Sequence, residues 1–398
     1  MPQGEFIMTE NSQFDLIVFG ASGFTGRLVA EYLNKQYGAN GSIRWAMAGR
    51  SEEKLAQVRA EIGVPDEVAL VVADTQDMAS VEAMVAQAKC IITTVGPYQL
   101  YGTKLVEACA NAGVDYVDLS GEPLWMYDMI DQFDAKARET GARIVHSCGF
   151  DSIPFDLGVL FLQNAAQAEF GRPAPRVRCR VRVMDGEFSG GTAASLGASM
   201  ARLEKEPDLF MRMIDPFCLA NGFKGPDQPQ DNKPYEDELL GMWVAPFIMA
   251  AINTKNVHRS NALMGHAYGE DFIYDEMMVA GAGEEGKAVA EFISSANPLQ
   301  GDNVPQPGEG PSREKREAGS YDVLFLGEMP DGTVLKAAVT GDMDPGYGST
   351  SKMLAESAIC LIEDCPDLKG GVYTSAPAMG DKLIARLVAN AGMTFERE

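Results

Sequence analysis

Along residues 14–150, two patterns of apolar and polar positions alternate. Short continuous apolar runs such as Leu16–Phe19 are typical of strands buried on both faces of a parallel sheet. Between the runs, apolar residues recur at helical spacing, as at Leu28, Val29, Tyr32 and Leu33. Strand and helix patterns alternate six times, which predicts an α/β fold with a doubly wound parallel sheet of the Rossmann type.

The pattern changes near Pro154. From 176 to 183, arginines occupy every second position, with Val or Cys between them, and this alternation predicts a half-buried strand. We expect the arginine row (176, 178, 180 and 182) to be a solvated face rather than a ligand site. Two strand-like runs around Pro330-Asp331-Gly332 predict a β-hairpin.

The chain, at 398 residues, is longer than one ordinary domain core. We therefore expect a flexible N-terminal tail over 1–13, a dinucleotide-binding domain over 14–153 and a second domain over 154–343. Within the second domain, 221–238 and 297–319 are polar and rich in Pro and Gly, which predicts two long loops.

The stretch FDLIVFGASGFTG places three glycines between the first predicted strand and the first predicted helix. Such a turn lets the backbone approach a pyrophosphate, and the N–H groups at the helix start favour the negative charge. A purely structural turn is the alternative. The context predicts a dinucleotide site formed by Gly20, Ser22, Gly23, Phe24, Thr25 and Gly26.

The end of the second predicted strand indicates which dinucleotide binds. An acidic residue there holds the ribose 2′-hydroxyl of NAD, whereas an arginine accommodates the 2′-phosphate of NADP. Arg50 and Ser51 follow this strand, with Lys54 close behind and no acid in the position. Ser51 also suits a helix cap, and the two roles are compatible. We therefore predict NADP(H) as the cofactor.

Residues at the ends of the later strands are further candidates, because the ligand of such a sheet lies outside the carboxyl ends of its strands. Asp74 is expected to accept a hydrogen bond from the adenine amino group. Gly96, Pro97 and Tyr98 are expected near the nicotinamide end.

Composition and charge exclude several classes of function. A net charge of −24 would repel a nucleic acid. The seven cysteines include no C-x-x-C pair, which indicates a reducing compartment, and the three histidines lack zinc-type spacing, so no metal site is expected. Walker A, G-x-S-x-G and Tyr-x-x-x-Lys motifs do not occur. Redox chemistry that a bound cofactor supplies remains.

The sequence indicates neither a secretory signal nor a transmembrane segment. Its start, MPQGEFIMTENSQ, lacks a basic stretch followed by a long apolar core. The longest apolar stretch, 239–252, contains a proline and is shorter than the roughly 20 residues of a spanning helix. We expect a cytoplasmic protein, with a peripheral contact to a membrane left open.

The segments GASGFTG, AGRSEEKL, TTVGPYQLYGTKLVEACANAGVDYVDLSGE and HSCGFDSIPFDLG together resemble the saccharopine dehydrogenase-like oxidoreductase family. FSGGTAAS, APFIMAAINTKNVHRSNAL and DPGYGSTSKMLAESA are similar to its bacterial branch of trans-acting enoyl reductases. The resemblance spans nearly the whole chain and is specific to the family rather than to a substrate. It implies NADP(H) in the first domain and an inserted α+β second domain. It also implies a C-terminal segment, 344–398, that returns to the first domain.

Similar enoyl reductases reduce a carbon–carbon double bond in a fatty acyl or polyketide chain on a carrier protein. Hydride transfer to the β-carbon of an enoyl thioester would need an oxyanion donor and a proton for the α-carbon. The candidates by strand-end position are Tyr98, Ser120, Glu122 and Asp151, with Tyr98 the first choice. The segment 239–252 is expected either to wall an apolar tunnel or to be an ordinary buried helix.

Two other functions stay open. A saccharopine-type amino-acid dehydrogenase would need arginines that converge on several carboxylates, and Arg182, Arg202 and Arg259 are the candidates. A non-catalytic NADP(H) sensor would bind cofactor without turnover. The expected partner is a small-molecule or carrier-bound apolar substrate, and a homodimer stays open. An acidic carrier would be repelled by the acidic chain unless the arginine row 176–182 faces it.

Overall fold

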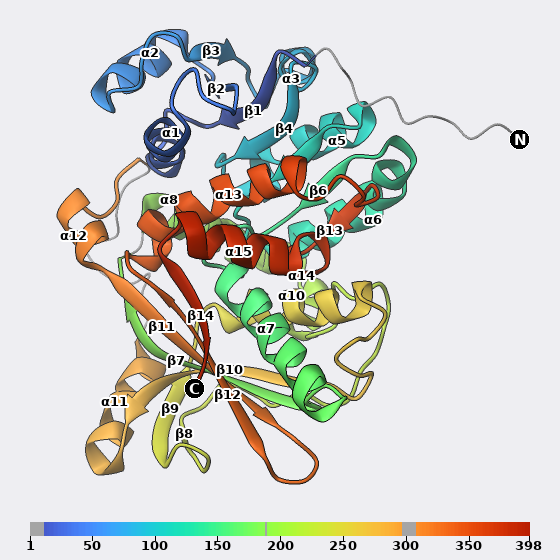
Figure 1. Ribbon diagram of the computed structural model, residues 1–398, viewed down its shortest axis with the longest axis vertical. Coiled ribbons are helices and arrows are strands. Elements are labelled where there is room, and N and C mark those ends of the chain that lie inside the picture. Colours follow the sequence, from blue (N-terminus) through green and yellow to red (C-terminus); the bar gives the residue numbers. More distant parts are fainter. Residues whose placement is uncertain (1–11, 188, 297–307) are drawn as a thin grey trace, which may run out of the picture.

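The computed structural model describes residues 12–187, 189–296 and 308–398, which form two seven-stranded sheets and the helices around them (Figure 1). The first sheet lies at the top of Figure 1 and the second at the bottom. Residues 1–11 of the predicted tail and 297–307 of the second predicted loop lie outside the described residues.

The first sheet is parallel throughout, as predicted, with the order β13-β6-β5-β4-β1-β2-β3. Its strands are β1 (Phe14–Phe19), β2 (Trp45–Gly49), β3 (Ala69–Val72), β4 (Ala88–Thr93), β5 (Asp115–Val117), β6 (Arg143–Val145) and β13 (Gly371–Tyr373). All six residues of β1 are buried, because helices cover both faces of such a sheet.

The helices of this part of the chain are α1 (Phe24–Tyr37), α2 (Glu52–Glu61), α3 (Met78–Val85), α4 (Tyr98–Tyr101), α5 (Thr103–Ala112) and α6 (Pro123–Thr140). Gly113 ends α5 and Gly141 ends α6, with left-handed φ angles of 69° and 90°. Glycine adopts this conformation without steric cost, so each helix stops where its sequence predicts.

The second sheet is mixed, with the order β14-β12-β11-β7-β10-β9-β8. Its strands are β7 (Arg176–Asp185), β8 (Tyr235–Asp237), β9 (Met242–Pro246), β10 (Ile273–Gly281), β11 (Ser320–Glu328), β12 (Val334–Gly341) and β14 (Met393–Arg397). The helices with it are α7 (Ile153–Phe170), α8 (Gly190–Lys205), α9 (Leu209–Ile214), α10 (Ala250–Leu263), α11 (Gly283–Ser295) and α12 (Arg313–Ala318). β10 and β7 pair in parallel, and β11 and β12 form the predicted hairpin.

The C-terminal segment serves both sheets, since it supplies β13 to the first and β14 to the second. It also contains η1 (Pro345–Ser349), α13 (Thr350–Glu363), α14 (Ser375–Ala378) and α15 (Gly380–Asn390). In Figure 1, α13 and α15 lie between the two sheets, and α7 runs from this layer across the second sheet. One apolar cluster joins Val18 of β1, Phe155 of α7, Phe325 of β11 and Ile359 of α13. The two sheets therefore share a core.

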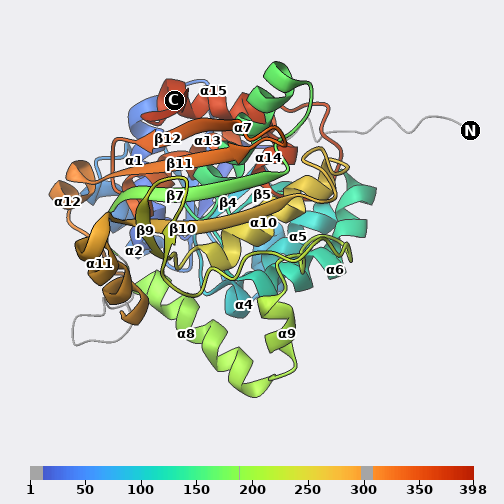
Figure 2. The same cartoon turned by 90° about the horizontal axis from the view of Figure 1, so that it is seen from below.

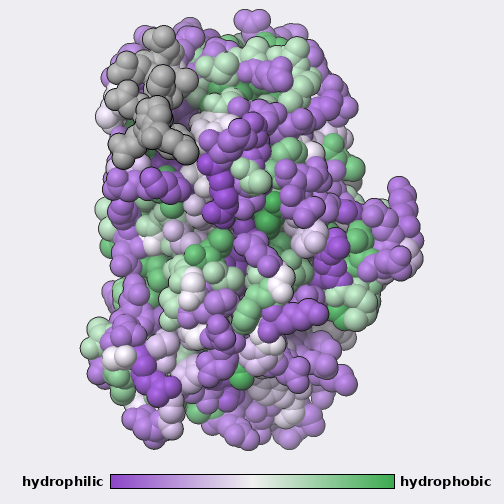
Figure 3. Space-filling model, turned by 90° about the vertical axis from the view of Figure 1, so that its right-hand side faces the viewer, coloured by the Kyte–Doolittle hydropathy of each residue, from purple (hydrophilic) through white to green (hydrophobic). Residues whose placement is uncertain are grey.

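Two helices, α8 and α9, project from the rest of the molecule in the view of Figure 2. Met200, Phe210, Met211 and Ile214 on them are exposed. On the face in Figure 3, hydrophobic side chains lie in separate groups among hydrophilic ones. Among the described residues, no helix is long and apolar enough to cross a membrane.

Candidate active site

A cavity of about 1080 Å³ lies at the carboxyl ends of the first sheet's strands. The turns that follow β1, β2, β4, β5 and β6 line it, together with α8, η1 and the start of α10. A doubly wound sheet binds its ligand at this edge. The cavity is also large enough for a cofactor-sized ligand.

The glycine turn after β1 forms one wall. Ser22, Gly23, Phe24 and Thr25 line the cavity with Gly20. A Cβ on Gly20, which has a φ of +89°, would lie 2.7 Å from Thr94 Oγ1. Gly26 is absent from the lining, but a Cβ there would lie 2.1 Å from the Gly20 carbonyl oxygen, so this glycine lets α1 approach the turn closely.

Cationic side chains gather beside this wall. Arg50 is exposed and lines the cavity, as do Lys54 and Arg27. Within the described part of the chain, Arg50 forms no ion pair, whereas Arg27 lies 3.9 Å from a carboxylate oxygen of Glu61. The Ser51 hydroxyl accepts a hydrogen bond from Lys54 N at 3.2 Å and caps α2 instead of lining the cavity.

The structure does not bring Asp74 to the cavity. Its carboxylate accepts a hydrogen bond from Gln76 N at 2.9 Å and so closes a local turn. Thr75 and Gln76, the next two residues, line the cavity in its place. The strand-end rule finds this region but cannot resolve which residue of the turn faces the ligand.

Tyr98 lines the cavity with Gly96 and Pro97, but its hydroxyl is committed elsewhere. The hydroxyl donates to the Thr93 carbonyl at 3.1 Å and accepts from Leu119 N at 3.3 Å. The ring stacks on Trp125 at 5.3 Å. Burial raises the pKa of Tyr98 well above its usual value.

Glu122 clamps the loop that carries Tyr98. Its carboxylate accepts from the backbone N–H groups of Tyr98 at 2.8 Å and Gln99 at 2.9 Å, and from the side chain of Ser195 on α8. Burial raises the pKa of Glu122, and these hydrogen bonds act in the opposite direction. Ser120 is fully buried and does not line the cavity, and its hydroxyl oxygen accepts a hydrogen bond from Glu122 N.

Asp151 lies in the cavity wall between β6 and α7. Burial raises the pKa of its carboxyl to about 7. A carboxyl with this pKa is protonated to a large extent near neutral pH, as a general acid must be. Of the four candidate catalytic residues, Asp151 alone has its carboxyl or hydroxyl group free of a hydrogen bond to another described residue.

Residues 184–252 contribute a second part of the wall, called here the apolar wall, in which apolar side chains stand beside Glu187 and the hydroxyl groups of Ser189, Thr192, Ser195 and Ser199. Its apolar side chains include Met184, Leu196, Met213, Ile248, Met249 and Ile252. Of the segment 239–252, only residues 248, 249, 251 and 252 line the cavity, and 242–246 form β9. Among the described residues, the cations of the lining are Arg27, Arg50 and Lys54.

The arginines considered for a substrate with several carboxylates are engaged elsewhere. Arg182 and Arg202 form ion pairs with carboxylates outside the cavity lining. Arg259 donates to two main-chain carbonyls.

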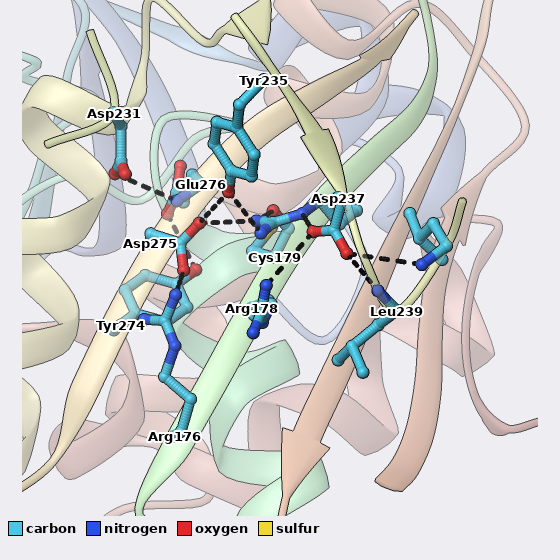
Figure 4. Close-up of polar contacts among 12 residues, drawn as sticks. Arg176, Arg178, Cys179, Asp231, Tyr235, Asp237, Leu239, Tyr274, Asp275 and Glu276 are labelled. Atoms are coloured by element: carbon cyan, nitrogen blue, oxygen red, sulfur yellow. Dashed lines mark hydrogen bonds and ion pairs between the residues drawn. The ribbon is translucent and has the colours of Figure 1, made fainter. Parts of the chain in front are cut away.

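The prediction of a solvated arginine row on β7 is wrong. Arg180 is fully buried and lies 2.7 Å from carboxylate oxygens of both Asp237 and Asp275. Arg176 pairs with Asp275, and Arg178 lies 3.7 Å from Asp237 (Figure 4). Alternation reveals that a strand is half buried, but the paired carboxylates come from β8 and β10, which are distant in sequence. These arginines hold the second sheet together.

No group of three or more His, Cys, Asp or Glu within the described ranges could hold a metal ion. All seven cysteines are buried and unbridged.

Comparison with known proteins agrees with this geometry. A family model, the saccharopine dehydrogenase NADP binding domain, matches residues 16–145. A Mycobacterium tuberculosis (strain ATCC 25618 / H37Rv) protein, provisionally named a trans-acting enoyl reductase, is 40% identical, with 96% of this chain and 97% of the relative covered. The trans-acting enoyl reductase of Mycobacterium ulcerans (strain Agy99) is 36% identical, with 94% of this chain and 96% of the relative covered.

Among solved structures, apo saccharopine dehydrogenase (L-Glu forming) from Saccharomyces cerevisiae has a similar fold. The TM-score is 0.54 at 11% identity, and the match covers 97% of this chain and 99% of the other.

Proposed function

The chain belongs to the saccharopine dehydrogenase-like oxidoreductases and is an NADP-dependent enzyme, and we propose that it reduces the carbon–carbon double bond of an apolar enoyl substrate. One observation carries the proposal. Among the described residues, the cations of the lining are all near the glycine turn, whereas residues 184–252 contribute apolar side chains and no cation, and Asp151, a carboxyl of raised pKa, lies in the wall.

The residues beside the glycine turn fit NADP(H). Gly20 and Gly26 let the turn pack closely on Thr94 and on α1, and the turn itself lines the cavity where a pyrophosphate would bind. Arg50, which has no carboxylate partner among the described residues, is free to bind a 2′-phosphate, with Lys54 beside it. Bound NADPH supplies the hydride for the substrate's β-carbon.

Asp151 supplies the proton for the α-carbon. Its protonated form is populated near pH 7, and it faces the cavity. We assign this role to Asp151 rather than to Tyr98, because the Tyr98 proton is already donated to a carbonyl group of its own domain. Tyr98 and Glu122 instead fix the loop that carries Gly96 and Pro97, which are proposed to contact the nicotinamide end.

The lining argues against the amino-acid dehydrogenase alternative. A substrate with several carboxylates needs cations at the reacting end, since a buried charge is costly unless it is paired. Among the described residues of 184–252 that line the cavity, none is an arginine or lysine. A pure NADP(H) sensor, in turn, gives no reason for a carboxyl of raised pKa in the wall.

The partner and the location are further proposals. The named relatives support an acyl substrate, and we propose that it is presented either free or on a carrier. The arginine row of β7 is neutralised by internal carboxylates, so it does not attract an acidic carrier. A cytoplasmic location, a homodimer and a peripheral membrane contact stay predictions.

The test is the loss of nicotinamide absorbance with purified protein. NADPH and NADH are each offered with enoyl thioesters of rising chain length, and separately with lysine and 2-oxoglutarate. The proposal expects turnover of long enoyl thioesters with NADPH. Turnover of the lysine mixture would support the amino-acid branch, and tight NADPH binding without any turnover would support the sensor.

A further inference from the structure

Tyr347 brings a phenol hydroxyl to the cavity from a segment with no predicted site residue. It lies in η1, a single π-helical turn before α13, and lines the cavity. The Asp344 carboxylate accepts from the N–H groups of Tyr347 at 3.0 Å and Gly348 at 2.7 Å, which fixes the turn. Isolated π-helical turns occur frequently at functional sites.

The side chain of Tyr347 is held by three segments of the chain. Its ring packs edge-on against Phe24 of the glycine turn, with centroids 5.1 Å apart. Its hydroxyl accepts a hydrogen bond from Ser189 N at the start of α8. The same hydroxyl shares a hydrogen bond with Thr192 Oγ1 at 3.0 Å. The position of the hydroxyl is thus fixed by tertiary contacts.

Counting protons shows that this pair has one hydroxyl proton to spare. Tyr347 and Thr192 carry two hydroxyl protons, and one of them forms the bond between the two oxygens. The Ser189 N–H already occupies a lone pair of the phenol oxygen. Ser189 and Thr192 are the hydrogen-bond partners of the Tyr347 hydroxyl. When Thr192 donates to the phenol oxygen, the phenol proton can turn toward a ligand in the cavity.

This hydroxyl lies within electrostatic reach of the proposed proton donor. Burial is the largest cause that raises the pKa of Tyr347, and the charge of Asp151 raises this pKa further. Both residues line the cavity. An enoyl thioester needs two groups there, a proton source for its α-carbon and a donor for its carbonyl oxygen.

We propose that Tyr347 is a second catalytic residue, whose hydroxyl donates a hydrogen bond to the carbonyl oxygen of the enoyl substrate. The inference rests on the proposed function. The double bond gains a hydride at the β-carbon from NADPH, which leaves as NADP+, and a proton at the α-carbon from Asp151. After hydride transfer and before protonation, the electron pair of the double bond is shared with the carbonyl oxygen. The Tyr347 hydroxyl stabilises this charge by a hydrogen bond and keeps its own proton. Solvent later reprotonates the Asp151 carboxylate.

The test compares Tyr347→Phe with a matched control, Tyr321→Phe. The Tyr321 hydroxyl also pairs with a side-chain hydroxyl, that of Ser349 at 3.0 Å, but Tyr321 does not line the cavity. We expect Tyr347→Phe to lower kcat and kcat/KM for an enoyl thioester together by about 10²–10³-fold, with the Kd for NADPH within about twofold. Tyr321→Phe should keep kcat within about threefold.

A second variant separates donation to substrate from a merely structural role. Incorporation of 3-fluorotyrosine at position 347 keeps the hydroxyl and its contacts but makes the phenol more acidic. A donor to the substrate oxygen predicts a changed kcat with NADPH affinity retained, whereas a structural hydroxyl predicts no change.

The outcomes distinguish the two proposals. Wild-type turnover of enoyl thioesters decides the proposed function, and its absence overturns both. Given that turnover, an unchanged kcat in Tyr347→Phe overturns the role of Tyr347 alone. A weaker Kd for NADPH with kcat unchanged also overturns it, because the hydroxyl would then bind cofactor.

Discussion

The cavity wall beside the glycine turn and the apolar wall differ in the charged side chains that they carry. Beside the glycine turn, Arg50 and Lys54 line the wall, and Arg50 has no ion-pair partner among the described residues. In the apolar wall, Ile248, Met249 and Ile252 line the cavity, and no described residue of 184–252 in the lining is an arginine or lysine. The wall beside the glycine turn therefore suits a ligand with phosphates, and the apolar wall suits an uncharged chain. The comparison teaches that unpaired cations, rather than the number of arginines in a domain, indicate where an anion binds.

Asp151→Asn should have the largest effect. The amide cannot give up a proton, so kcat for enoyl reduction should fall by about 10²–10⁴-fold. The matched control is Asp156→Asn, five residues further on in α7. Its carboxylate accepts a hydrogen bond from Ala376 N outside the cavity lining, so this variant should keep kcat within about threefold. Stopped-flow kinetics measure both variants. An active Asp151→Asn enzyme would remove Asp151 from the mechanism.

Arg50→Ala tests the wall beside the glycine turn. Loss of charge-assisted hydrogen bonds to the 2′-phosphate should reduce the preference for NADPH over NADH by about 10–100-fold. Arg182→Ala, which removes a paired arginine of the second sheet, should leave the preference unchanged. Isothermal titration with NADPH and with NADH measures the preference. An undiminished preference in Arg50→Ala would place the 2′-phosphate site elsewhere.

Ile248→Arg tests the apolar wall by adding the cation that it lacks. Ile248 is 40% exposed at the cavity wall, so the new charge keeps access to water. We expect kcat/KM for a long enoyl thioester to fall about tenfold, while the Kd for NADPH stays constant. Ile248→Met is the control. An unchanged kcat/KM for the long enoyl thioester in Ile248→Arg would contradict the comparison.

The pH dependence of the wild-type kcat tests the role of the Asp151 carboxyl. The acid form of Asp151 acts and its pKa is raised to about 7, so kcat should be level below that pH and fall about tenfold per unit above it. The same shift costs stability, because a raised folded-state pKa disfavours folding as pH rises from the unfolded to the folded pKa. The Tm of Asp151→Asn should therefore exceed the wild-type Tm above pH 7 and approach it near pH 4. A pH-independent difference in Tm would argue against burial as the cause.

Local patterns predicted the first sheet well, since glycine turns, buried strands and helix ends depend on neighbouring residues. Gly20 and Gly113 are examples. Contacts between distant segments could not be predicted. Arg180 reads as one of a solvated row, yet its partners Asp237 and Asp275 are 57 and 95 residues away. Tyr347 was missed for the same reason, because Ser189 lies 158 residues from it. The turn after β3 was predicted to line the cavity, but Thr75 and Gln76 line it instead of the predicted Asp74. Side-chain direction in a turn depends on the turn's own hydrogen bonds, here the one from Gln76 N to Asp74.

The most direct test of the account is to follow the hydride. NADPH carrying deuterium at the transferred position of the nicotinamide is incubated with the protein and a long enoyl thioester, and the product is analysed by mass spectrometry. The account predicts a saturated acyl product with one deuterium at the β-carbon and a solvent-derived hydrogen at the α-carbon. An unlabelled product, or deuterium found only in an amine formed from lysine and 2-oxoglutarate, would contradict it.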